Sequence, residues 1–193
     1  MKLYRVVLAS LALSGGLAAQ QPAAPQANPM VAAFKGRILG ASRNIAQAFD
    51  SIPESKFSYK PTSAQLSFGY IAQHIAADNY LFCGAFGTAK PSLPERDTAT
   101  PDSLKAKWPK EELVSKLKAS FAFCAEAIAG LTDATLPEAT TITFGGTARP
   151  TTRIAMVLGH ALDLADHYSQ IANYMRLNGM TPPSALPRPR PGN

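Results

Sequence analysis

Apolar residues recur at intervals of three and four along four long stretches of this chain, and this spacing constrains the fold more than any other feature. Because an α-helix turns once every 3.6 residues or so, the spacing places those side chains on one helix face. The clearest stretch begins at Pro109, where the proline and two following glutamates are typical of a helix N-terminus. Its apolar stripe consists of Val114, Leu117, Phe121, Cys124, Ile128 and Leu131. Such a stripe packs against neighbouring helices.

Three other helices are expected, over 28–52, from between 62 and 67 to about 84, and over 150–178. Asn28 is the expected N-cap of the first, and Gly179 the left-handed cap that ends the last. The proline-rich stretch 87–109 predicts a long loop without a strand. Four long antiparallel helices without alternating strands predict an all-α fold, a four-helix bundle.

One stretch departs from the helical pattern. Residues 140–147 are strand-like and include the pair Gly145-Gly146. They predict a short hairpin or an extended loop before the last helix.

The first twenty residues have the features of a signal peptide. Lys2 and Arg5 precede an apolar run of about a dozen residues, and Ala18-Ala19 are small residues typical of a cleavage site. The run is short for a membrane span, although an uncleaved N-terminal anchor is the alternative. We therefore expect a bacterial protein that is exported, periplasmic or secreted, with no stable membrane insertion after cleavage.

The remaining chain divides by composition. Residues 21–28 are rich in Ala, Gln and Pro and predict a flexible linker, and 181–193 form a proline-rich tail. Between them, 29–180 is long enough for one domain with its own core. Lys2 and Arg5 account for two of the formal +6 charges, so the residues after the leader carry +4, scattered without a basic run. This pattern does not predict nucleic-acid binding.

The chain has two cysteines, Cys83 and Cys124. In an oxidising compartment such a pair is normally bridged, so we expect a disulfide. Two buried free thiols are the alternative. Neither cysteine belongs to a Cys-x-x-Cys pair, which makes a two-cysteine metal site the weaker interpretation.

All three histidines of the chain lie in two helical stretches. His160, Asp163 and His167 point within a sector of about 60° on one helix face. Asp163 and His167, four residues apart, can converge on one ion, with His74 as the third ligand. Two nitrogens and a carboxylate suit zinc, nickel, iron or manganese. His160 is the second-shell group or alternative ligand, and Asp78, one turn beyond His74, can orient its ring.

The same residues allow a plainer interpretation. Two histidines and an aspartate can also form a buried hydrogen-bond network without an ion. Candidate pocket residues around such a site are Tyr70, Tyr168 and Arg176.

Three segments resemble the DinB-like superfamily. Residues 67–80, SFGYIAQHIAADNY, are similar to its second helix, and 167–170, HYSQ, with 174–183, are similar to its fourth. The stretch 52–61 resembles the connector between its first two helices. The resemblance implies an up-down-down-up bundle that often holds a divalent metal through three histidines. His74 and His167 match two of them, whereas Asp163 stands where the family usually has the middle histidine.

The resemblance also implies classes of reaction. Characterised relatives include thiol-dependent S-transferases and a maleylpyruvate isomerase that use mycothiol or bacillithiol. We therefore expect a metal-binding protein acting as a hydrolase or transferase on a small-molecule substrate, although an oxidising compartment is a poor place for a reduced-thiol cosubstrate. The alternative is a non-catalytic binding or stress-related bundle. A homodimer through an apolar helix face fits either function.

Overall fold

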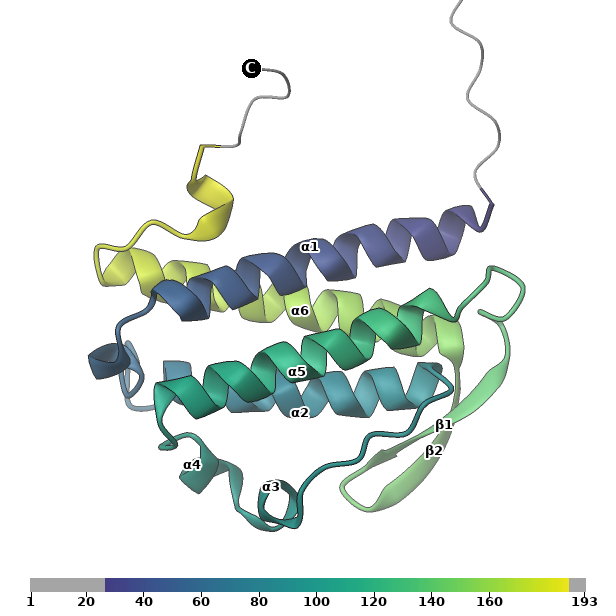
Figure 1. The fold of residues 1–193 in the computed structure, drawn as a ribbon, viewed down its shortest axis with the longest axis horizontal. Helices are drawn as coiled ribbons and strands as arrows, with labels where there is room; N and C mark the ends of the chain where they lie inside the picture. The colour runs from purple at the N-terminus through teal and green to yellow at the C-terminus, as the bar shows by residue number, and fades with distance from the viewer. Residues whose placement is uncertain (1–26, 188–193) are drawn as a thin grey trace, which may run out of the picture.

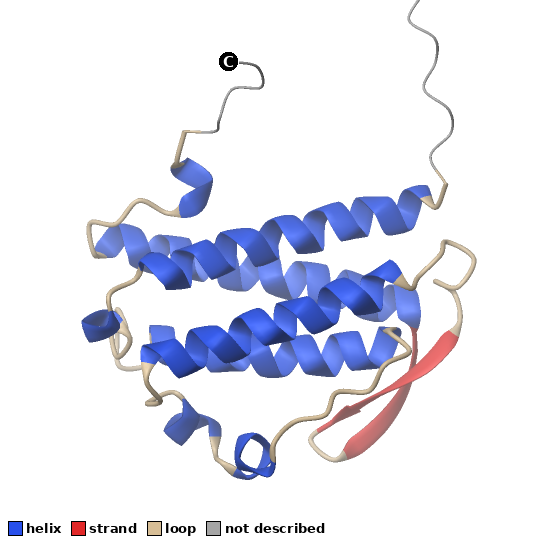
Figure 2. Ribbon diagram, in the orientation of Figure 1, coloured by secondary structure: helices blue, strands red, loops and turns tan. Residues whose placement is uncertain are grey.

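The computed structural model describes residues 27–187 and is built from four long helices (Figures 1 and 2). They are α1 (Pro29–Ser51), α2 (Phe68–Phe86), α5 (Lys110–Ala129) and α6 (Arg153–Leu177). The shorter elements are η1 (Glu54–Lys56), α3 (Glu95–Ala99), α4 (Asp102–Lys105), β1 (Ala139–Phe144), β2 (Thr147–Thr152) and η2 (Pro183–Ala185). The predicted signal peptide 1–20, most of the linker and the end of the tail lie outside the described residues. Within 27–187, no helix has both the length and the apolar character that crossing a membrane requires.

The long helices form a bundle in which α1 and α2 each pack against α5 and α6. In Figure 1, α1 and α6 run in one direction and α2 and α5 in the other. The predicted helical bundle is therefore confirmed, but its helices are not all antiparallel to their neighbours. The long connection 87–109 runs back along the bundle and lets α5 start at the same end as α2.

Side chains from all four helices fill the core. The whole predicted stripe is buried, from Val114 in α5 to Leu131 just beyond its end. An aromatic cluster closes the end of the bundle where α2 begins, with Phe68 edge-on to Tyr174 at a ring-centroid distance of 5.6 Å. The cluster consists of Phe49, Phe57, Tyr59, Phe68 and Tyr174.

The cap of α1 differs from the expected one. Asn28 has a left-handed backbone (φ 55°), and its side chain makes no capping bond to α1. Instead, the carboxylate of Asp133 accepts hydrogen bonds from the amides of Met30 (3.0 Å) and Val31 (2.8 Å). Asn28 Oδ1 in turn accepts from the Asp133 amide at 2.9 Å. The turn after α5 thus caps α1, a contact that local sequence does not reveal.

Removing this cap should weaken the bundle. We expect Asp133→Ala to lower the free energy of unfolding by about 1 kcal/mol, because two amides at the α1 N-terminus lose their acceptor. Urea denaturation measures the change. Asp166→Ala, an exposed carboxylate on α6, is the control and should stay within about 0.5 kcal/mol of the wild type. Equal values for the two variants would contradict this capping role.

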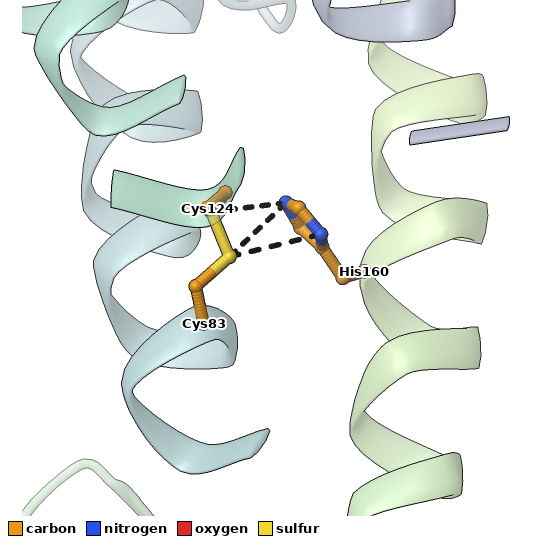
Figure 3. A group of neighbouring side chains, drawn as sticks. All are labelled: Cys83, Cys124 and His160. Carbon is orange, nitrogen blue, oxygen red and sulfur yellow. Dashed lines mark hydrogen bonds between the residues drawn. A yellow bond between two sulfur atoms is a disulfide. The ribbon is translucent and has the colours of Figure 1, made fainter. Parts of the chain in front are cut away.

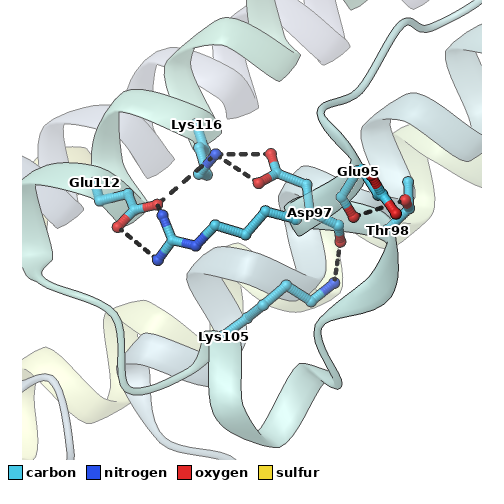
Figure 4. A network of polar contacts seen from close by, with 7 residues as sticks. Glu95, Asp97, Thr98, Lys105, Glu112 and Lys116 are labelled. Atoms are coloured by element: carbon cyan, nitrogen blue, oxygen red, sulfur yellow. Dashed lines mark hydrogen bonds and ion pairs between the residues drawn. The ribbon is translucent and has the colours of Figure 1, made fainter.

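The connection between α2 and α5 has no strand, as predicted, but it contains α3 and α4. Arg96 pairs with Glu112 of α5 at 2.7 Å, and Lys116 of α5 pairs with Asp97 at 2.7 Å (Figure 4). The Trp108 ring lies 4.3 Å from the Arg96 guanidinium and 5.3 Å from Lys116 Nζ. Exposed ion pairs contribute little singly, so the network with its cation–π contacts holds the segment against α5 collectively.

The strand-like stretch is a hairpin. Strands β1 and β2 are antiparallel, with Phe144 opposite Thr147. Gly145 (φ 57°) and Gly146 (φ 78°) occupy the turn, where a two-residue hairpin needs positive φ. Pro150 lies in β2, so α6 begins three residues later than expected. Gly179 (φ 71°) ends α6 with the predicted left-handed cap.

Candidate metal centre

His74 of α2 and His167 of α6 face each other inside the bundle. Their rings are edge to face, with centroids 5.0 Å apart. The two helices run in opposite directions, so residues early in α2 lie beside residues late in α6. The structure thus brings together the two histidines that the resemblance matched to the family's ligands.

A carboxylate lies one helical turn from each of these histidines. Asp78 Oδ2 is 3.1 Å from His74 Nε2, and Asp163 Oδ1 is 3.4 Å from His167 Nε2. One ligand atom of each of His74, Asp78 and His167 lies within 4.8 Å of the other two. Asp163 is adjacent to His167 but outside that set of three. Asp78, expected to orient His74, is therefore as well placed to be a ligand as Asp163.

The two carboxylates influence each other and the histidines. Burial raises the pKa of Asp78, and the charge of Asp163 raises it further, against the lowering effect of the two histidines. Burial lowers the pKa of His167, but the close approach of Asp163 and the charge of Asp78 outweigh burial and leave that pKa raised. Both shifts mean that this cluster holds protons more tightly than isolated side chains do. A cation among these groups would take the place of those protons.

Two buried polar atoms in this cluster have no hydrogen-bond partner in the described part of the chain. They are Asp163 Oδ2 and His167 Nδ1. A buried polar atom without a hydrogen-bond partner costs free energy, so such an atom is normally paired with another group, a water molecule or an ion. Two imidazoles and two carboxylates are donors that suit a divalent transition metal. The side chains remain partly exposed, from 10% for His167 to 34% for His74, which leaves a path from solvent.

His160 does not join this cluster. It is fully buried, and its Nε2 lies 2.8 Å from Asn79 Oδ1 and 3.8 Å from Cys124 Sγ. The expectation of a second-shell or alternative ligand near His167 is therefore not met. Seven residues correspond to about 10 Å along the helix axis, which puts His160 at another level of the bundle.

The predicted disulfide is present at that level. Cys83 of α2 is bonded to Cys124 of α5, and the His160 ring faces both sulfur atoms (Figure 3). Asn79 Nδ2 donates to Ser120 Oγ at 2.8 Å, so one buried polar chain links α6, α2 and α5. Burial lowers the pKa of His160 to about 4, which keeps the ring neutral.

Sequence reasoning missed Asn79 and Ser120 as members of this chain. A signal for Asn79 was present. If α2 and α6 are antiparallel and His74 lies opposite His167, then His160, seven residues before His167, lies at a level about seven residues after His74, close to Asn79.

The three predicted pocket residues lie in different places. Tyr70 lines an open groove of about 810 Å³, and its ring centroid is 6.1 Å from that of His74. Tyr168 instead accepts a hydrogen bond from the Ser184 amide through its hydroxyl, at 2.8 Å. Arg176 is exposed and lines a separate surface hollow on α6. Only Tyr70 thus connects a cavity with the histidine pair.

The sequence model described as the DinB superfamily matches residues 38–171 of this chain. This range includes both histidines of the cluster, both aspartates and the cysteine pair. No curated protein matches the chain.

Solved structures with the same fold include DinB-like proteins from two bacteria. A Bacillus cereus protein is 16% identical, with a TM-score of 0.59, covering 78% of this chain and 93% of its own. A protein from Exiguobacterium sibiricum is 18% identical, with a TM-score of 0.58, covering 80% and 95%. A mycothiol-dependent maleylpyruvate isomerase is 9% identical, with a TM-score of 0.56, covering 74% of this chain but 59% of its own. At these identities the likeness shows the fold alone.

Proposed function

This chain belongs to the DinB superfamily, and we propose that it binds one divalent metal ion between α2 and α6. The ion would serve hydrolysis or group transfer on a small substrate. The observation that carries the proposal is the meeting of His74, Asp78 and His167, from two helices, within 4.8 Å of one another.

The chain's own residues have distinct tasks in this proposal. His74 and His167 hold the ion, and Asp78 or Asp163 supplies the carboxylate. The remaining aspartate orients the histidine of its own helix, because it lies one turn away and faces that ring's Nε2. When bound, the ion would act as a Lewis acid that polarises a substrate carbonyl or lowers the pKa of bound water or of a thiol.

The groove beside Tyr70 is the proposed entrance for the substrate. Lys60, Lys107 and Trp108 line it together with Tyr70, so it offers positive charge and aromatic surface. A small anionic or aromatic molecule fits this lining. The tyrosine ring, next to His74, can then orient the substrate at the ion.

We also propose that the protein is exported. The leader-like segment 1–20 supports this, and so does the Cys83–Cys124 disulfide, since structural disulfides persist mainly in oxidising compartments. Because an oxidising compartment is a poor place for a reduced-thiol cosubstrate, any transferred group would come from a substrate other than a small thiol.

The enzymatic proposal can be tested with hydrolase and transferase substrates in the presence of zinc, nickel, iron or manganese. We expect activity that a chelator removes, and that His167→Ala lowers at least about 100-fold, roughly 2.7 kcal/mol of lost transition-state stabilisation. Asp166→Asn, next to His167 but exposed, should retain full activity. Activity that survives both chelation and His167→Ala would contradict the proposal.

A non-catalytic bundle is the second candidate. It is favoured by the fact that each histidine already has an aspartate partner on its own helix. In that case, adding zinc, nickel or manganese leaves the melting temperature unchanged. Metal binding instead predicts that the free energy of unfolding rises by about 2.7 kcal/mol when the free metal concentration is 100 times the dissociation constant.

A further inference from the structure

A second group of metal-binding side chains lies away from the His74–His167 pair. Ligand atoms of Cys83, Cys124 and His160 all lie within 4.8 Å of one another. All three side chains are buried, at 0%, 2% and 0% exposure. They come from three helices, α2, α5 and α6, so their convergence is a property of the fold.

In the described structure the two sulfurs are joined and cannot bind an ion. Every newly made chain, however, begins with both cysteines as thiols. We propose that this dithiol form holds one Zn²⁺ between Cys83, Cys124 and His160, and that disulfide formation closes the site. The proposal is independent of the metal site at His74 and His167.

The distances fit such a centre. His160 Nδ1 lies 3.8 Å from Cys83 Sγ, and one ligand atom from each of the three side chains lies within 4.8 Å of the other two. In a tetrahedral zinc site with Zn–S near 2.3 Å and Zn–N near 2.0 Å, nitrogen and sulfur are about 3.5 Å apart. His160 Nδ1 therefore stands at nearly the separation from Cys83 Sγ that a shared ion requires. Breaking the S–S bond lets the sulfurs separate to similar distances.

Hydrogen bonding also prepares the His160 ring as a ligand. Asn79 uses Nδ2 to donate to Ser120, so its Oδ1 accepts the Nε2–H of His160 at 2.8 Å. Nδ1 then carries the lone pair and faces Cys83 Sγ. Metal-binding histidines usually donate their second ring nitrogen to an oxygen in this way. Two sulfurs and one imidazole favour zinc over magnesium or calcium, and water completes the fourth position.

A dithiol reductant transfers two electrons and two protons to the Cys83–Cys124 disulfide and becomes a disulfide itself. Each thiol then releases one proton to solvent as it binds Zn²⁺ as a thiolate. In reoxidation, a disulfide oxidant accepts two electrons from the thiolates and two protons from solvent and becomes a dithiol, while the Cys83–Cys124 bond reforms and the ion is released. Metal binding and disulfide formation thus compete for the same two sulfur atoms.

The test uses Co²⁺ as a spectroscopic probe for zinc, with the full chain refolded either oxidised or under a non-thiol phosphine reductant. A His167→Ala background removes the other proposed metal site, so failure of one site is distinguishable from failure of the other. We expect a thiolate-to-cobalt charge-transfer band, at one equivalent, in the reduced chain alone. The oxidised chain should show none.

Two variants define the ligand set. Cys83→Ser should abolish the band, and His160→Gln, which keeps a side chain able to bond Asn79, should weaken Co²⁺ binding at least about tenfold. One equivalent of Zn²⁺ should also slow alkylation and reoxidation of the two cysteines in the reduced chain, at least about tenfold. Circular dichroism verifies that each protein is folded. A folded, reduced chain without the band, or equal affinity in His160→Gln, would overturn the proposal.

Discussion

Removing the Cys83–Cys124 disulfide is expected to lower the free energy of unfolding by about 4 kcal/mol, the largest effect of any change considered. The bond closes a loop with a sequence separation of 41 residues. In the chain-entropy model, a loop of this size restricts the unfolded chain by about that amount. It also joins α2 to α5, two parallel helices whose connection has only short helices of its own.

Guanidinium denaturation of the wild type and of Cys83→Ala/Cys124→Ala measures this loss. A chelator must be present, because zinc bound to the reduced wild type would mask part of it. The reduced wild type is the matched control and should resemble the double variant. A loss below about 1 kcal/mol in both proteins would show that the bundle holds α2 against α5 without the bond.

Acid should destabilise this protein through His160. Burial lowers the pKa of His160 to about 4, against an ordinary value near 6.5. Between these values the unfolded chain binds a proton that the folded chain does not, so stability is full above pH 6.5 and falls as the pH drops toward 4. The expected loss is about 3 kcal/mol across this window, and it levels off below it.

The difference between the wild type and His160→Gln isolates this effect, because other groups titrate in the same window. Asp78 and His167 have raised pKa values, and both are present in the two proteins. We expect the two stability curves, measured in urea from pH 4 to 8, to converge at the acid end. Parallel curves would contradict a buried, neutral His160.

The four long helices could be predicted because each carries its own signal. Apolar spacing sets the buried face, and residues such as Pro109 and Gly179 mark the ends. Helices α3 and α4 could not be predicted in this way. They are too short for a periodic pattern; contacts from α5 to Arg96 and Asp97 hold α3 in place, and α4 packs against α2.

Part of the site could be predicted as well. The family resemblance singled out His74 and His167, and the structure brings them to a ring-centroid distance of 5.0 Å. The choice between Asp78 and Asp163 could not be made from spacing, because each lies one turn from a histidine. The rotation of α2 against α6 decides which carboxylate faces both rings.

His160 shows the limit of reasoning from one helix. It shares a face with His167, which suggested a common site. The level along the axis, however, depends on which residues of α2 and α5 lie opposite. Those residues are Asn79 and the two cysteines, and they give His160 a separate environment.

The most direct test of the account is calorimetric titration of the oxidised, chelator-treated chain with Zn²⁺. We predict one equivalent bound, with at least about 100-fold weaker binding in His74→Ala and in His167→Ala, since each removes a ligand from a different helix. Asp166→Asn should bind as the wild type does. Comparing Asp78→Asn with Asp163→Asn identifies the ligating carboxylate as the one whose substitution weakens Zn²⁺ binding more. Binding below about a tenth of an equivalent, or binding that neither histidine variant changes, would contradict a metal centre between α2 and α6.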